Sequence, residues 1–274
     1  MKKKILIIGQ KGFIAANLLK FLKTKNIYII STSFEKFIKN YNFFDKKFEY
    51  IINCSSNKNF VNKKYLIKND NDFRIANKIV NSKTKLLMLS TRKVYKPKFN
   101  IKETDLKKPK CNYSKNKLIA ENSIRKILKN KSLILRIVNI VGSPIKNKRK
   151  IHKTFINIFF DKAKSGIIYK NSHIYKDFIS IKNFNEIVFK LIIENASGIY
   201  NVSSGKKIYI NQIVNWLNFY NKKKIIKIFA KKSFNNDNFT LNNRKLMDKI
   251  KIKNISNNLK NECMKISKKF FRKK

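Results

Sequence analysis

A tyrosine and a lysine with the potential for acid–base chemistry stand four residues apart, at Tyr113 and Lys117. If the run 111–121 is helical, residues four apart share one face of the helix, so the phenol and the ammonium group would project into the same space. A phenol normally loses its proton near pH ~10, and a nearby positive charge lowers that pKa. We therefore expect the pair to act as a general acid and base near neutral pH.

Short apolar runs alternate with helical stretches through the first half of the chain and must position this pair. The runs that predict strands are 5–8, 27–31, 49–54, 85–90 and 133–138, and the clearest helical stretches are 73–81 and 114–129. Continuous apolar runs are typical of strands buried on both faces, and their alternation with helices indicates a parallel sheet with right-handed crossovers. We predict an α/β fold with a doubly wound parallel sheet.

The pattern changes to shorter, mixed elements after about residue 145. We therefore predict a larger N-terminal domain over 1–145 and a smaller C-terminal lobe over 146–274.

Two glycines lie between the first predicted strand and the first helix, at Gly9 and Gly12, with the small Ala15 three residues further on. This is the context that a dinucleotide-binding turn requires, because the backbone must approach a pyrophosphate and the helix N-terminus supplies free N–H groups. We predict that this turn binds NAD or NADP. The second strand ends at Ser31 without the carboxylate that would select NAD, and Lys36 is available for a 2′-phosphate, so both cofactors remain open.

The formal charge of +50 is extreme, with 65 Lys and Arg against 15 Asp and Glu. Lysine is dispersed through every segment, and Lys, Asn and Ile are abundant residues that all have A/T-rich codons. The charge thus reflects genome composition as much as a polyanionic partner, and we do not expect nucleic acid as a partner.

Two histidines and three cysteines show no metal-ligand spacing, so we expect no metal site and a reducing compartment. No run approaches the roughly 20 apolar residues of a membrane helix. We expect no membrane partner and a cytoplasmic protein.

Several segments, taken in order, carry a resemblance to a known family. They are GQKGFIA (9–15), INCSS (52–56), LSTRKVY (89–95), LRIVNIVGSP (135–144), KDFISI (176–181) and GIYNVSSG (198–205). With Tyr113, Lys117 and Glu121 at the expected spacing, the chain resembles the extended short-chain dehydrogenase/reductases, specifically the nucleotide-sugar epimerases, dehydratases and 4-keto reductases. The resemblance implies a Rossmann-type fold with the NAD(P)-binding domain over 1–145. It also implies that 146–274 is mostly a substrate-binding lobe, with about 176–203 returning to the Rossmann sheet. The implied substrate is a nucleotide sugar, and many relatives form homodimers.

The resemblance also implies roles for individual residues. Tyr113 would exchange a proton with the sugar, Lys117 would hold the nicotinamide ribose and depress the pKa of the phenol, and Thr91 would bond the same sugar oxygen. Asn139 and Lys176 would meet the nucleotide diphosphate. The residues expected to line the cofactor are Gly9, Gly12, Phe13, Ile14, Ser31, Cys54, Ser55 and Lys117.

Two reactions and one non-catalytic alternative fit this resemblance. We favour an epimerase, which oxidises and re-reduces the sugar on one bound cofactor, over an NADPH-consuming 4-keto reductase of the dTDP-4-dehydrorhamnose type. Arg92 and Lys93 stand where a dehydratase usually has an acidic pair, which argues against dehydration. The alternative of another class is a nucleic-acid-binding or regulatory Rossmann protein. The presence of Thr91, Tyr113 and Lys117 argues against it.

A third strand of the nucleotide-binding half is also in question, because the segment before Glu49 is short. We expect that strand and its adenine-contacting carboxylate to be reduced or missing. Asp45 is a poor substitute for the carboxylate.

Overall fold

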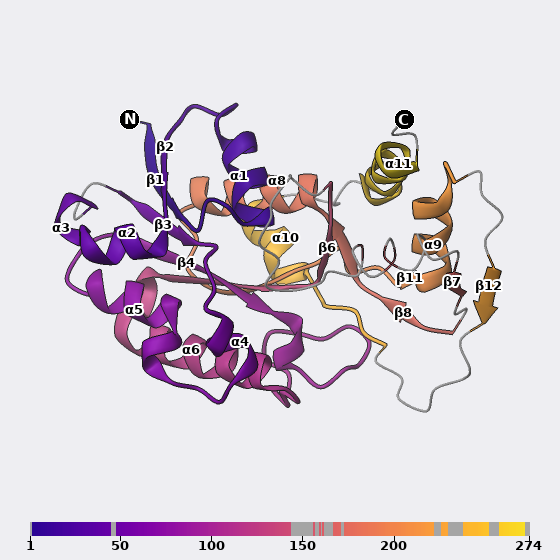
Figure 1. Cartoon of the computed structure of the whole chain (residues 1–274). Coiled ribbons are helices and arrows are strands. Elements are labelled where there is room, and N and C mark those ends of the chain that lie inside the picture. The colour runs from indigo at the N-terminus through magenta and orange to yellow at the C-terminus, as the bar shows by residue number, and fades with distance from the viewer. Residues whose placement is uncertain are drawn as a thin grey trace.

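The architecture comes from a computed structural model, shown in Figure 1. The structure describes residues 2–44, 48–143, 156, 159, 161, 167–170, 173–221, 226–229, 238–251 and 258–271. Within this part of the chain, none of the helices combines the length and the apolar character needed to cross a bilayer.

Six parallel strands form the central sheet, in the order β10-β5-β4-β3-β1-β2. Their bounds are β1 Lys3–Ile8, β2 Ile27–Thr32, β3 Tyr50–Asn53, β4 Lys85–Thr91, β5 Ser132–Ile137 and β10 Gly198–Val202. Each strand predicted from an apolar run is therefore present, and the fold is the predicted α/β sheet of the Rossmann type. In β1, Ile5, Leu6, Ile7 and Ile8 have no exposed surface, as expected for a strand covered on both faces.

Helices cover both faces of this sheet (Figure 1). One face carries α1 Phe13–Leu22, α8 Ile181–Ile193 and α10 Arg244–Ile250, and the other carries α2 Phe34–Lys39, α3 Tyr41–Phe44, α4 Lys58–Asn62, α5 Asn71–Lys78 and α6 Asn112–Leu128. Two separate apolar clusters lie between the sheet and these two layers. Three short 3₁₀ helices are η1 Ile67–Asn69, η2 Arg92–Val94 and η3 Lys129–Lys131.

β2 is the edge strand of the sheet, at the side where a further strand of the nucleotide-binding half would pair. In the described part of this segment, α2 and α3 follow β2 directly, and no strand lies outside β2. The side chain of Ser33 caps α2 by accepting the N–H of Lys36 at 3.2 Å, and Glu35 lies in the first turn of that helix. Asp45 lies outside the described residues. The short segment before β3 therefore folds into helices and not into a further strand.

The C-terminal part adds a smaller group of elements beside the sheet, on the right of Figure 1. They are β6 Asn139–Val141, β7 Ile167–Lys170, β8 Tyr175–Lys176, β9 Phe178–Ser180, β11 Ile208–Tyr209, α9 Ile210–Asn218, β12 Ile226–Phe229 and α11 Asn258–Phe271. The strands pair as β6 with β9, β8 with β11 and β7 with β12. A third apolar cluster joins α9, α11 and β9. The boundary placed at residue 145 falls outside the described residues, so the division of the chain there remains a proposal.

Candidate active site

Helix α6 carries both Tyr113 and Lys117 in its first two turns. The chain enters the helix through Ser114, whose hydroxyl accepts the N–H of Cys111 at 3.2 Å and donates to the carbonyl of Cys111 at 2.9 Å. Side chains that hydrogen-bond the free backbone groups at a helix start stabilise that start. Tyr113 is half-buried, and only 6% of the surface of Lys117 is exposed.

The ammonium group of Lys117 forms a buried ion pair. Its Nζ donates to Oδ2 of Asp72 at 2.8 Å and lies 5.5 Å from the centre of the Phe60 ring. Asp72 lies in the first turn of α5, and its Oδ1 accepts from Nδ2 of Asn53 at 2.6 Å. Asn53 is the last residue of β3, so the pair is held between α6, α5 and the carboxyl end of the sheet.

The residues that follow β3 continue this polar network toward the glycine turn. The backbone N–H and the hydroxyl of Ser55 both donate to Oδ1 of Asn53, at 2.9 and 2.6 Å. The hydroxyl of Ser55 also accepts from Nδ2 of Asn71 at 2.9 Å. Ser55 is thereby fixed beside the turn after β1.

Gly9 has to be a glycine at this point of the fold. Its φ is +88°, and a Cβ on it would lie 2.6 Å from the backbone nitrogen of Ser55 and 2.9 Å from the carbonyl carbon of Cys54. Such contacts are shorter than any real Cβ makes, and the dihedral is one that residues with a side chain rarely adopt. The glycine turn therefore touches the end of β3, and the network of Ser55, Asn53 and Asp72 joins it to Lys117.

The other residues predicted to line the cofactor surround the same turn. Gly12 precedes the first residue of α1, and no side chain caps that helix start. Free N–H groups at a helix start favour a phosphate there. Phe13 and Ile14 begin α1 and pack against the apolar cluster below it, and Ser31 lies in β2 opposite Ile7 of β1.

The phenol of Tyr113 differs from our expectation in its electrostatics. Burial raises the pKa of Tyr113, and although Lys117 lowers it, Asp72 and Cys111 raise it further. Lys117 thus lowers the pKa of the phenol as expected, but burial and the neighbouring groups outweigh it, and the net shift of the pKa is upward. The prediction considered only the two residues on α6 and not the carboxylate that Lys117 contacts.

The two partners of the pair also affect the thiol beside them. Burial and then Asp72 raise the pKa of Cys54 to about 12, against a lowering effect of Lys117. Burial lowers the pKa of the Lys117 ammonium, but Asp72 and Tyr113 outweigh this, so that its pKa is raised and the group stays charged. The site thus contains a permanent cation with a carboxylate against it.

Thr91 ends β4, the strand next to β3 in the sheet. Its Oγ1 accepts the backbone N–H of Lys93 at 3.2 Å, which leaves the hydroxyl proton to donate elsewhere. The neighbouring Arg92 places its guanidinium 3.7 Å from the centre of the Phe239 ring. The Nζ of Lys176 lies 5.9 Å from the centre of the same ring. One aromatic side chain therefore brings Lys176, in β8, close to the segment that begins at Thr91.

Asn139 lies at the start of β6, and its Nδ2 donates to the carbonyl of Asp177 at 3.3 Å. It follows the end of β5 by two residues and pairs with Phe178 of β9. The structure therefore places Asn139 where the central sheet meets the C-terminal lobe.

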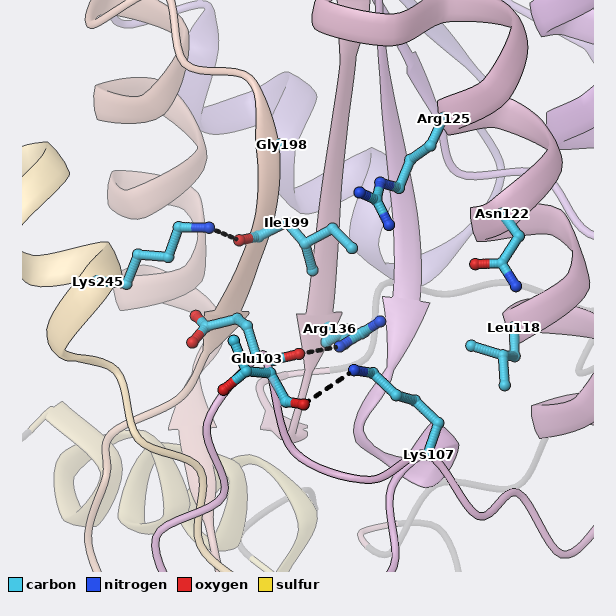
Figure 2. A pocket seen from close by; sticks show the side chains of 10 residues that line it. Glu103, Lys107, Leu118, Asn122, Arg125, Arg136, Gly198, Ile199 and Lys245 are labelled. Atoms are coloured by element: carbon cyan, nitrogen blue, oxygen red, sulfur yellow. Dashed lines mark hydrogen bonds between the residues drawn. The ribbon is translucent and has the colours of Figure 1, made fainter.

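A cavity of about 530 Å³ lies beside α6 (Figure 2). Leu118, Asn122 and Arg125 line it from the helix, and Lys245 lies on the opposite side. Neither Tyr113 nor the glycine turn lines this cavity, which is therefore distinct from the candidate active site.

Two residues of the site were missed by sequence reasoning, Asp72 and Asn53. Asp72 is one of only 15 acidic residues in the chain, and a carboxylate that is rare by composition is a signal that could have pointed to it. Asn53 was noticed only as part of the INCSS segment. Neither residue has a fixed spacing from Lys117 that a pattern could detect.

Solved structures of known proteins share this fold at low sequence identity. A UDP-N-acetylglucosamine 4-epimerase from Methanobrevibacter ruminantium M1, in complex with UDP-N-acetylmuramic acid, is 18% identical with a TM-score of 0.80, over 99% of both chains. A dTDP-4-dehydrorhamnose reductase from Clostridium acetobutylicum is 18% identical with a TM-score of 0.74, over 96% of this chain and 98% of that one. RMD from Pseudomonas aeruginosa, complexed with NADPH, is 14% identical with a TM-score of 0.79, over 99% of both chains.

Further structures with this fold hold NAD. No curated protein matches the chain by sequence. A family model does match it: the model described as RmlD substrate binding domain covers residues 2–170, more than half of the chain. The chain belongs to this family, and thereby to the extended short-chain dehydrogenase/reductases that its motifs resemble.

Proposed function

We propose that the protein is an NAD(P)-dependent enzyme that acts on a nucleotide-activated sugar by hydride transfer, with Tyr113 as the general acid and base. One observation carries this proposal. The glycine turn and the Tyr113–Lys117 helix, which are more than 100 residues apart, meet through Ser55, Asn53 and Asp72 at the carboxyl end of the sheet. Ligands of open α/β sheets bind at this end.

The residues around the turn suit a dinucleotide. Gly9 leaves room where any side chain would strike the backbone of Cys54 and Ser55, and the uncapped start of α1 presents N–H groups to a pyrophosphate. When bound, the nicotinamide supplies the hydride chemistry. Lys117 would hold the ribose with the donors that Asp72 leaves unused, and Tyr113 would give or take the proton of the reacting sugar oxygen. Phe13, Ile14, Ser31, Cys54 and Ser55 would complete the cofactor side.

The sugar would lie between this end of the sheet and the C-terminal lobe, 146–274. Thr91 would donate its hydroxyl proton to the same sugar oxygen as Tyr113. Lys176 and Asn139 would contact the diphosphate, with Lys176 acting as a point charge because it lacks the planar fork of arginine. A homodimer that pairs through α6 is part of the same proposal, and sedimentation velocity tests it.

An epimerase is our first choice and a 4-keto reductase our second. Structures of both kinds match the fold at 18% identity, so the comparison supports the shared chemistry and does not separate the two reactions. Mass spectrometry of the cofactor that co-purifies with the protein separates them. Tightly held NAD supports an epimerase, whereas no bound cofactor together with NADPH consumption supports a reductase.

The test of the enzyme proposal is Tyr113→Phe. The substitution removes one hydroxyl from a half-buried ring, so the fold and dinucleotide binding should persist while turnover falls about 10²–10⁴-fold. Turnover is measured with UDP-N-acetylglucosamine and dTDP-4-dehydrorhamnose, and binding by the fluorescence of NADPH. Tyr209→Phe, at an exposed tyrosine on β11, is the matched control and should keep full turnover. Equal turnover in the Tyr113→Phe variant and the control would refute the proposal.

The non-catalytic alternative is tested separately by fluorescence anisotropy with a DNA duplex at physiological salt. Affinity that falls steeply with salt and shows no sequence preference is what a charge of +50 produces by itself. Only tighter, sequence-selective binding would favour this alternative.

A further inference from the structure

Asp72 occupies a place in the site that neither the motifs nor the family match assigns. Only 3% of its surface is exposed, and both of its carboxylate oxygens are engaged, Oδ2 by Nζ of Lys117 at 2.8 Å and Oδ1 by Nδ2 of Asn53 at 2.6 Å. We propose that Asp72 is a positioning residue of this site, which fixes the ammonium of Lys117 and supplies a counter-charge to it beside Tyr113. The role in catalysis rests on the proposed function, whereas the electrostatic effect on Tyr113 can be measured without it.

The geometry gives Asp72 control over where the ammonium sits. A lysine side chain has a flexible stem of four carbons and a compact charge, so the position of its ammonium group depends on the group that it pairs with. Asn53 fixes the carboxylate from the other side, and Asn53 is itself fixed at the end of β3 by the two hydrogen bonds from Ser55. Lys117 is therefore located relative to the sheet end and the glycine turn, and not only relative to its own helix.

The same contact weakens the effect of Lys117 on the phenol. A cation and an anion 2.8 Å apart act on a third group largely as a dipole, and their separate effects on Tyr113 have opposite signs. Burial raises the pKa of Tyr113, Lys117 lowers it, and Asp72 raises it. Removing the carboxylate alone should thus leave the cation unopposed and lower the pKa of the phenol.

Other charged and titratable groups face this pair from each neighbouring element. Cys111, at the start of α6, acts on the phenol, and Lys93 of η2 acts on that thiol. Asp70, which caps α5, raises the pKa of Lys117. The pKa of Cys54, after β3, is raised by Asp72 and lowered by Lys117. All of these groups are unchanged in an Asp72→Asn variant, so a shift in the titration of Tyr113 is attributable to the lost carboxylate.

The experiment is a ¹³C NMR titration of the full-length protein labelled at the ring Cζ of tyrosine. Tyr113→Phe identifies the signal of Tyr113 among the 11 tyrosines. In Asp72→Asn the titration midpoint of Tyr113 should move to lower pH. Asp70→Asn is the matched control, because Asp70 is on the same helix start, asparagine is as good a helix cap, and Asp70 is not among the groups that act on the phenol. It should leave the midpoint where it is.

A second comparison avoids an unpaired buried cation, which can prevent folding. Lys117→Met leaves Asp72 without its partner and should move the midpoint of Tyr113 to higher pH. The double variant Asp72→Asn with Lys117→Met should have a lower midpoint than Lys117→Met, because it also lacks the carboxylate. Equal midpoints in these two variants, or in the wild type and a folded Asp72→Asn, would overturn the proposal.

This result is independent of the test of function. Retained turnover in Tyr113→Phe would refute the proposed reaction. The effect of Asp72 on the titration of Tyr113 would still stand. An unshifted midpoint together with lost turnover in Tyr113→Phe would keep the enzyme and assign Asp72 a purely structural role.

Discussion

Two buried ion pairs attach α6 to the rest of the fold, and they differ in how completely they are satisfied. Lys117 and Glu121 are one helical turn apart on the same face of α6. Lys117 pairs with Asp72 of α5 at 2.8 Å, and Glu121 pairs with Arg136 of β5 at 2.6 Å. The first pair is linked to the glycine turn by the hydrogen bonds of Asn53 and Ser55, and Ser55 lies against Gly9. The second lies deeper, under β4 and β5.

The arginine pair is a closed structural unit. Its guanidinium donates three times to the Glu121 carboxylate, at 3.2, 3.1 and 2.6 Å, and also to the Tyr95 hydroxyl at 2.7 Å and the Glu103 carbonyl at 3.0 Å. The hydroxyl of Ser90 donates to the same carboxylate. Four of the five N–H groups of the guanidinium thus have acceptors within the protein, with Nε–H shared between the two carboxylate oxygens.

The lysine pair is different, because an ammonium group has three donors and Asp72 is the one hydrogen-bond acceptor that the described residues give it. A side chain with four of its five donors engaged inside the protein stabilises a fold, whereas one with two of its three donors to spare can still bind a ligand. The residue type at each position, a planar fork at 136 and a flexible point charge at 117, matches this division.

Breaking the arginine pair should have the largest effect on stability. Arg136→Met leaves the Glu121 carboxylate buried without its partner, so we expect the free energy of unfolding to fall by about 3–5 kcal/mol. Urea denaturation followed by circular dichroism measures this. Arg125→Met, at an exposed arginine of α6, the helix that carries Glu121, is the control and should change stability by less than about 0.5 kcal/mol. Similar losses in both variants would contradict the assignment of Arg136 as a structural residue.

Lys117→Met should affect activity more than stability. Asp72 keeps its hydrogen bond from Asn53 and can take up a proton, so we expect a loss of about 1–3 kcal/mol in stability. Turnover should fall about 10²-fold, because the cofactor ribose loses the group that would place it. Steady-state kinetics and NADPH fluorescence check this. Lys115→Met, on the exposed side of α6, serves as the reference and should match the wild type. A variant with normal turnover and a large loss of stability would reverse the roles of the two pairs.

Glycine substitutions on the two sides extend the comparison with a smaller effect. In Gly9→Ala the new methyl carbon would lie 2.6 Å from the backbone nitrogen of Ser55. The positive φ adds backbone strain, which should lower the free energy of unfolding by about 1–3 kcal/mol. Gly198→Ala, beside β5 on the arginine side, has a φ of +92° but nothing within 4 Å of the new carbon, so it measures the strain alone. Thermal unfolding gives both losses. Only Gly9→Ala should also weaken dinucleotide binding, and equal behaviour would argue against a cofactor at the turn.

Sequence reasoning identified the fold because the strands are short apolar runs. The runs 5–8 and 50–52, for example, contain no charged residue. Such runs are buried whatever the details of packing, and the helices between them impose the parallel order. It also anticipated that the described residues between β2 and β3 add no further strand to the edge of the sheet, because the segment before Glu49 is short. It could not predict the cavity beside α6, whose walls come from five separate segments.

The sequence by itself determined that Tyr113 and Lys117 share a face of one helix and that a glycine turn follows the first strand, since helix periodicity and turn conformation depend on neighbours in the chain. The contact of Lys117 with Asp72, 45 residues earlier, arose only when α5 packed against α6. The charge that Tyr113 experiences is a sum over groups brought together by folding, weighted by their burial, and a local pattern contains only one part of that sum. For this reason the spacing of the pair was readable in advance, whereas the direction of the phenol's pKa shift was not.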